Sequence, residues 1–237
     1  MARTSARPHP LARLIEEAFR RAGALRRRRP FHPVGVMAEG VLTITGTGPP
    51  LGVPLLDTAA THPVQARLSR AAGMPPGLPD VHGLALRLTG GERPVDLLMS
   101  STGAAPVLRH ALRPHRSLRG VHTSIVPYRT PAGPLLLAAQ PDDGAAVRRP
   151  FHPRRLREVL ATQGITFTLR AATPLGAWRD VGRIDLGLPG DAGAGRPRFD
   201  PVLNAHADLA SYALWAWPRL PAYRGARRGY PGGRARR

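Results

Sequence analysis

The chain has 237 residues, a length that accommodates one sizeable hydrophobic core, and its composition does not require two domains. It carries 35 basic and 15 acidic residues, a net charge of +20, and every basic residue is Arg. The complete absence of cysteine excludes disulfides, thiolate catalysis and cysteine-ligated zinc or iron–sulfur sites. No apolar run is long enough for a membrane span and no signal-peptide core precedes the first helix, so we expect a cytoplasmic protein.

The positive charge attracts anionic partners in general without identifying one. Its long-range field would draw nucleic acid, anionic lipid or a carboxylate-bearing ligand toward the surface. The exclusive use of Arg is typical of a biased genome composition, and the Arg-rich stretches lack the interleaved aromatic residues of single-strand binders. We therefore interpret the charge as a solvated surface and disfavour nucleic acid as a partner.

The first half of the chain begins with a helix-like segment and continues with strand-like ones. Helical spacing of apolar residues predicts an amphipathic surface helix over 10–27, which must end at Pro30. The β-branched residues of 31–45 predict a strand interrupted at Gly35 and Gly40. The remaining segments of this half are predicted as a loop at 47–54, a short helical turn at 61–70, and a hairpin of strands at 83–89 and 95–99.

The second half is predicted as strands with one short helix. Clean alternation indicates a strand at 165–169, and a single apolar face over 154–163 indicates a helix that Gly164 ends. The other expected segments are strands at 121–126, 134–139 and 181–188, a linker at 140–150, a flexible stretch at 190–197, and a helix at 208–217. Short adjacent strands joined by turns predict an α+β fold that is mainly antiparallel β, a barrel or strongly curled sheet with peripheral helices.

We expect three parts along the chain. Residues 1–28 form a basic N-terminal tail and amphipathic helix, and residues 29–228 form a single barrel domain. Residues 229–237 form a disordered basic tail, because this stretch is rich in Gly and Arg and has almost no apolar residues.

Common catalytic and metal-binding motifs do not occur in the sequence. There is no Gly-x-Ser-x-Gly turn to present a nucleophile and no His-Glu-x-x-His pair to hold zinc. The glycine-rich segment 190–195 follows a strand without leading into a helix, so it lacks the context of a phosphate loop. The sequence therefore excludes the standard patterns of hydrolases, zinc proteases and nucleotide-binding proteins.

Five short motifs stand in order along the chain: Arg29-x-x-His32-x-x-Gly35, Arg67-Leu-Ser69, Asp80-Val-His-Gly83-Leu-Ala85, Asp96-Leu-Leu-Met-Ser100-Ser101-Thr102, and Arg219-x-x-x-Tyr223. In this order they resemble segments of the haem catalases. The longest continuous resemblance covers residues 64–103, and the separate motifs together span most of the chain. The chain is, however, much shorter than a full catalase.

The resemblance implies a haem cofactor and a set of residues that bind it. Tyr223 would ligate the iron as a phenolate, an anionic ligand that favours the ferric state. Arg219, one helical turn earlier, would keep that phenolate ionised. Arg29 and Arg67 would pair with the haem propionates, for which the forked guanidinium is well suited.

On the opposite, distal side of the haem, the resemblance assigns catalytic roles. His32 would act as general acid and base toward the peroxide, and Ser69 would orient its ring. The two glycines of the first predicted strand would present bare backbone to the porphyrin. Where catalases carry an Asn that orients the peroxide, this chain has Ser100 or Ser101, so we expect weak disproportionation of hydrogen peroxide.

The resemblance thus implies a small catalase-like haem protein with peroxidase-type oxidoreductase activity. Its substrate would be a small-molecule peroxide or an organic hydroperoxide, and a homo-oligomer is left open. The alternative is a non-enzymatic barrel without haem that serves as a binding scaffold for an apolar or anionic ligand. Nucleic-acid association through the basic surface is a third alternative that only the net charge supports.

Without the resemblance, the same residues have simpler structural explanations. His32 could be an exposed residue at the start of a strand, and Tyr223 a surface aromatic beside the basic tail. Arg67 could be the ion-pair partner of Asp80 or Asp96. These explanations remain open at the level of the sequence.

Overall fold

The computed structural model describes residues 13, 16–17, 20–21, 32–189 and 197–212. The chain divides into two compact units, one of residues 32–212 and one of the terminal segments 1–31 and 213–237. In the terminal unit, the described residues are helical, as predicted for 10–27, and Glu17 accepts hydrogen bonds from Arg20 and Arg21 at 2.7 Å. The tails and the segment 190–196 lie outside the described residues.

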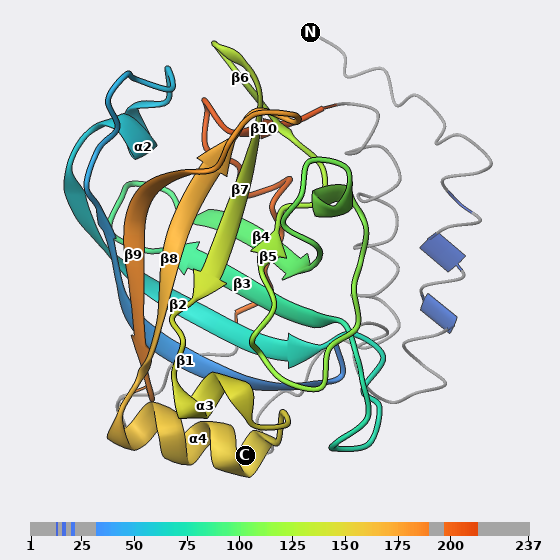
Figure 1. Ribbon diagram of the computed structural model, residues 1–237. Coiled ribbons are helices and arrows are strands. Elements are labelled where there is room, and N and C mark those ends of the chain that lie inside the picture. Colours follow the sequence, from blue (N-terminus) through green and yellow to red (C-terminus); the bar gives the residue numbers. More distant parts are fainter. Residues whose placement is uncertain (1–12, 14–15, 18–19, 22–31, 190–196, 213–237) are drawn as a thin grey trace, which may run out of the picture. The chain divides into compact units, whose positions relative to one another are not determined.

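The unit of residues 32–212 is a closed antiparallel β-barrel (Figure 1). Its wall consists of β1 (Val34–Ile44), β2 (Ala60–Arg70), β3 (His82–Leu88), β4 (Val95–Ser101), β5 (His122–Thr123), β7 (Gly133–Pro141), β8 (Ile165–Ala172) and β9 (Arg179–Gly187). The order along the wall is β7-β5-β4-β3-β2-β1-β9-β8, and pairing of β8 with β7 closes the ring. The predicted fold class is therefore confirmed.

The shorter elements lie around this barrel. Strands β6 (Tyr128–Thr130) and β10 (Ala210–Ser211) extend the sheet beside β7. The helices are α2 (Pro54–Asp57), the 3-10 turn η1 (Leu108–His110), α3 (Ala145–Arg148) and α4 (Pro153–Thr162). Helices α3 and α4 lie at one end of the barrel, and α4 buries Leu156 and Leu160 in the core (Figure 1). No helix among the described residues is long and apolar enough to cross a membrane.

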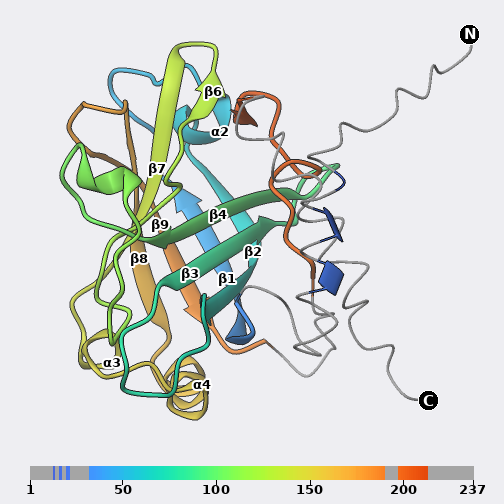
Figure 2. The same ribbon diagram turned by 90° about the vertical axis from the view of Figure 1, so that its right-hand side faces the viewer.

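The pleat of the strands separates an inner face from an outer face. On β1 to β4 the inward positions are aliphatic and almost fully buried, because side chains of an extended strand alternate between its two faces. The inward residues of these four strands include Val36, Ala38, Leu42, Ala66, Leu68, Leu84, Leu86, Leu97 and Met99. Figure 2 shows β1 to β4 side by side in this part of the wall. The outward positions of these strands are mostly half-buried, and many of them carry polar residues.

Several local predictions need correction. Residues 61–70 are strand rather than helical turn, because Val64, Ala66 and Leu68 fill the core at every second position. The first strand runs through both Gly35 and Gly40 without a break. Glycine is needed at position 40 because a side chain there would overlap the carbonyl of Asp185 on β9. The predicted linker at 140–150 is the end of β7 followed by α3. Within the predicted helix at 208–217, the described residues include the short strand β10 instead.

Candidate functional site

His32 stands at the entry to β1 and is held at its backbone and at its ring. Its φ of 54° is in the left-handed region, which a non-glycine residue occupies only where its surroundings fix it. The His32 N–H donates to the Ala71 carbonyl at 3.0 Å, and the Arg67 guanidinium donates to the His32 carbonyl at 2.7 Å. The ring atom Nδ1 lies 2.9 Å from Ser69 Oγ. The half-buried histidine is therefore oriented by three separate contacts.

Ser69 determines which ring nitrogen of His32 carries the proton. Its hydroxyl lies 3.3 Å from the Gly83 carbonyl, which can only accept, as well as 2.9 Å from His32 Nδ1. When the hydroxyl donates to Gly83, it accepts from Nδ1–H of the ring. We assign this tautomer, in which Nε2 keeps its lone pair and can take up a proton. Ser69 is itself only 4% exposed, so its geometry is well constrained.

The residues around His32 lie in one row across the barrel wall. Gly35 of β1 pairs with Ser69 of β2, Ser69 pairs with Gly83 of β3, and Gly83 pairs with Ser100 of β4. Directly opposite residues of an antiparallel sheet project from the same face, here the outer one. The structure therefore brings Ser69 and Ser100 onto the face that His32 also occupies.

The pleat distinguishes the two serines that the sequence left as alternatives. Ser101 points into the barrel, is 1% exposed, accepts a hydrogen bond from the His82 N–H at 3.0 Å and donates to the Arg113 carbonyl at 2.7 Å. Ser100 is half-buried on the outer face. Ser100 is thus the serine on the same face as Ser69, and Ser101 bonds within the barrel interior.

Arg67 belongs to the same outer face and supports the His32 backbone. The acidic residues that the sequence offered as its partners bind other arginines. Asp80 lies 3.4 Å from Arg70, with both side chains 2% exposed, and Asp96 lies 2.7 Å from Arg87. The hydrogen bond from Arg67 to the His32 carbonyl makes it a support of this residue, a role the sequence did not reveal.

Asp96 anchors a distant segment to the outer face beside this row. It is 1% exposed and accepts hydrogen bonds from the Asp200 N–H at 2.6 Å and from Asn204 Nδ2 at 2.7 Å, in addition to two from Arg87. The hydrogen bond to Asp96 raises the pKa of the Arg87 guanidinium above its ordinary value. Phe199 packs against this guanidinium, with 5.5 Å between its ring centroid and the Arg87 Cζ. No motif in the sequence links these residues, which are about a hundred positions apart.

A second group of histidines lies inside the barrel and was not anticipated. His82 and His122 are both 0% exposed. Burial, which disfavours the charged ring, lowers the pKa of His82 to about 4 and that of His122 to about 3. Their rings pack against aromatic side chains, His82 at 5.3 Å from Phe151 and His122 at 6.1 Å from Phe167 between ring centroids. They are neutral core residues at neutral pH.

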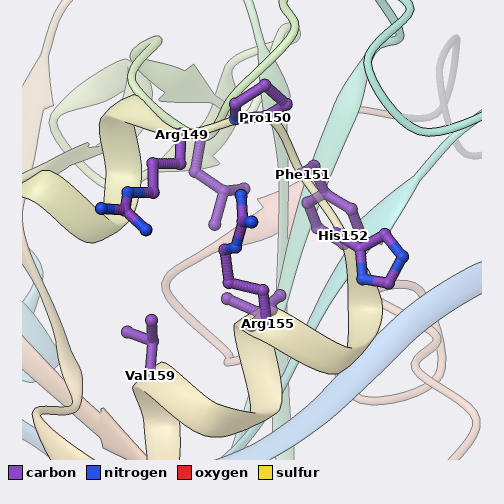
Figure 3. A pocket seen from close by; sticks show the side chains of 8 residues that line it. Arg149, Pro150, Phe151, His152, Arg155 and Val159 are labelled. Carbon is purple, nitrogen blue, oxygen red and sulfur yellow. The ribbon is translucent and has the colours of Figure 1, made fainter.

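A shallow hollow at the start of α4 carries positive charge but none of the predicted site residues. It is lined by Leu118, Arg149, Pro150, Phe151, His152, Arg155, Leu156 and Val159. In Figure 3 the Arg155 side chain rises from α4 toward the loop that carries Arg149. Within the described ranges, no group of His, Asp and Glu side chains is arranged to hold a metal ion.

Three of the predicted haem-binding residues cannot be related to this face. Arg29, Arg219 and Tyr223 lie outside the described residues. The structure therefore brings together the predicted distal residues His32, Ser69 and Ser100 with Arg67, and leaves the proximal ones as predictions. Gly40, which the resemblance assigned to the porphyrin face, points into the barrel with its partner Val64.

Comparison with solved structures shows the fold to be that of catalases. Catalase A from Saccharomyces cerevisiae matches with a TM-score of 0.59 and 14% identity over 83% of this chain and 59% of that chain. A fungal catalase matches with a TM-score of 0.64 and 17% identity over 85% of this chain and 59% of that chain. No family model and no curated protein matches the sequence. The chain therefore has a catalase-like barrel and spans 59% of the length of these two catalases.

Proposed function

We propose that this chain is a catalase-like haem protein that uses a peroxide or organic hydroperoxide as oxidant, with His32 as its acid and base. The observation that carries the proposal is the hydrogen bond of His32 Nδ1 to Ser69, on the outer face of a catalase-like barrel. A histidine in the barrel interior or without a partner would not support it. The motif order in the sequence supports the same function independently of the fold.

The distal residues fit such a cofactor. The row of Gly35, Ser69, Gly83 and Ser100 is made of small side chains, which lets the His32 ring and the Arg67 guanidinium lie close against the outer face of the wall, where they would meet the cofactor. Tyr223 would hold the iron, with Arg219 beside it, and Arg29 and Arg67 would meet the propionates. When bound, haem would supply the two electrons that reduce the peroxide, and it would be oxidised in turn.

The protein residues would manage the protons of that reaction. His32 Nε2 would accept the proton of the peroxide hydroxyl and return it to the departing oxygen, which then leaves as water or alcohol. Ser69 would hold the proton of the neutral ring on Nδ1 by accepting from Nδ1–H, so that Nε2 carries the lone pair before each transfer. Ser100, with a shorter reach than the Asn of catalases, would orient hydrogen peroxide poorly. A peroxidase-type reaction with organic substrates is therefore favoured over rapid disproportionation.

Reconstitution with haem tests this proposal. We expect recombinant protein to bind haem with a Soret band and a phenolate-to-iron charge-transfer band, both lost or shifted in Tyr223→Phe. We expect His32→Ala to keep the Soret band and lose peroxide turnover. A protein that binds no haem, or whose spectrum is indifferent to Tyr223, would contradict the assignment.

The alternative function is a binding scaffold without haem. It is favoured by one observation, the serine at position 100 where catalases have their distal Asn. In that case the outer face of β1 to β4 would bind an apolar or anionic ligand, with Arg67 as the cation. Binding of a fatty acid by haem-free protein, weakened in Arg67→Ala and unaffected by haem, would support this alternative.

A further inference from the structure

Three glycines surround the turn at His32 and Pro33. At each of them a side chain would overlap this turn or a residue that contacts it. A Cβ on Gly83 would lie 2.5 Å from His32 Cε1, 2.8 Å from His32 Nδ1 and 3.0 Å from Ser69 Oγ. A Cβ on Gly73 would lie 2.6 Å from Pro33 Cγ. A Cβ on Gly35 would lie 2.7 Å from the Arg67 guanidinium nitrogen that binds His32. None of these contacts is compatible with a methyl group unless the neighbour moves.

Backbone conformation explains only one of these glycines. Gly73 has a φ of +73°, which disfavours other residues whatever the space around it. Gly35 and Gly83 lie within strands and are not among the residues with positive φ. Glycine inside a strand weakens it, and where conformation does not require it, it marks a close approach of another group. The close group at Gly83 is the His32 ring, and the close groups at Gly35 are the Arg67 guanidinium and the Leu68 carbonyl, which lies 2.8 Å from the Cβ position.

We propose that Gly83 is a positioning residue for His32. Its bare backbone lets the imidazole lie directly against β3, where Nδ1 reaches Ser69 while the His32 backbone is bound to Ala71. Gly35 has the same role one step removed, because it admits the Arg67 guanidinium that holds the His32 carbonyl. The catalytic consequence rests on the proposed function, whereas the placement of the ring does not.

The placement is tested in haem-free protein by NMR of histidine labelled with ¹⁵N. We expect the His32 imidazole, assigned by its loss in His32→Gln, to show a single tautomer protonated at Nδ1. In Gly83→Ala the methyl displaces the ring from Ser69, and we expect the spectrum of a ring that exchanges between both tautomers, as in Ser69→Ala. A spectrum of Gly83→Ala that keeps the single Nδ1–H tautomer would overturn the proposal.

Two further variants separate positioning from a general effect on folding. Gly91→Ala is the matched control, because the nearest atom to its Cβ is 3.7 Å away, and we expect an unchanged His32 spectrum. If Gly83→Ala does not fold, the double variant Gly83→Ala with His32→Ala is expected to fold, since removal of the ring makes room for the methyl. Failure of this double variant to recover the fold would also overturn the proposal.

The catalytic consequence is measured after reconstitution with haem. We expect Gly83→Ala to lower peroxide turnover about 100-fold, the effect of misplacing a catalytic group by roughly 1 Å, without loss of the Soret band. The double variant Ser69→Ala with Gly83→Ala is expected to be little worse than either single variant, because both act through the same ring. Independent, multiplicative losses would contradict this. If wild-type protein binds no haem, the proposed function fails, and the NMR result still decides the role of Gly83.

Discussion

The barrel has histidines on both sides of its wall, and they differ in burial and in hydrogen bonding. On the outer face, His32 is half-buried and held by hydrogen bonds to its backbone and to its ring atom Nδ1. In the interior, His82 and His122 are fully buried, and each ring packs against an aromatic side chain. The first arrangement fixes the orientation of an imidazole, and the second keeps it uncharged. Histidines of one barrel therefore differ in their partners and in their face of the sheet, and these differences decide which of them is the candidate for chemistry.

The largest expected effect is on activity and concerns the outer histidine. We expect His32→Gln to lower peroxide turnover of the haem-loaded protein by about 10²- to 10⁴-fold, the range of a lost general acid and base. The interior variant His122→Leu should change turnover far less while lowering stability. Steady-state peroxidase assays and urea unfolding of both variants check this. Equal losses of activity in the two variants would contradict the special role of the outer histidine.

The next effect is on stability and concerns the buried carboxylate of the outer face. Asp96→Ala leaves Arg87 and the 200–204 segment without their acceptor, and we expect a loss of about 3 kcal/mol or more in the free energy of unfolding. Asp180→Ala, whose ion pair with Arg170 is exposed, should change it by less than about 1 kcal/mol. Urea denaturation measures both, and a small effect for Asp96 would show that the anchor is dispensable.

The interior histidines should make the barrel sensitive to acid. Their pKa values fall from 6.5 in the unfolded chain to about 4 for His82 and about 3 for His122 in the folded protein. At a pH below 6.5 and above these folded values, the unfolded chain therefore binds more protons than the folded protein. Stability is thus complete above about pH 6.5 and declines as the pH falls, by about 1.4 kcal/mol per pH unit for each histidine. Urea unfolding from pH 7.5 to 4.5 should show this slope. It should be clearly smaller in His122→Leu than in the wild-type protein, and the exposed His110→Gln serves as the control. Burial also lowers the pKa of His115, which contributes to the slope that remains.

The smallest expected effect concerns the serine row of the outer face. Ser100→Asn restores the longer amide donor of catalases, and we expect hydrogen peroxide disproportionation to rise about tenfold, equivalent to one ordinary hydrogen bond. Ser101→Asn, placed in the packed interior, should instead destabilise the barrel. Oxygen evolution measured for Ser100→Asn, with Ser100→Ala as the control, checks this. A gain from alanine as large as that from asparagine would show that size, rather than hydrogen bonding, matters at this position.

Local patterns in the sequence were sufficient for the elements whose two faces differ strongly. The alternation of Leu84, Leu86 and Leu88 with smaller or polar residues predicted β3, and the same reasoning predicted β8. In such strands the alternation of apolar and polar residues itself indicates which face is buried. Strand β4 was predicted as the return strand of a hairpin that begins with β3. Residues 60–70 were misjudged because Pro63, Gln65 and Arg67 on the half-buried outer face resemble a surface turn more than a strand.

The sequence by itself determined the antiparallel β class, the absence of cysteine chemistry and the candidates His32 and Ser69, because composition, periodicity and short motifs are local properties. Only the tertiary structure decided that the barrel closes through β7 and β8, that Ser100 rather than Ser101 lies on the outer face, and that Asp96 anchors a segment a hundred residues away. These results depend on strand register and on contacts between distant segments. Register assigns each side chain to the inner or the outer face, and a shift of one residue would have exchanged the two serines.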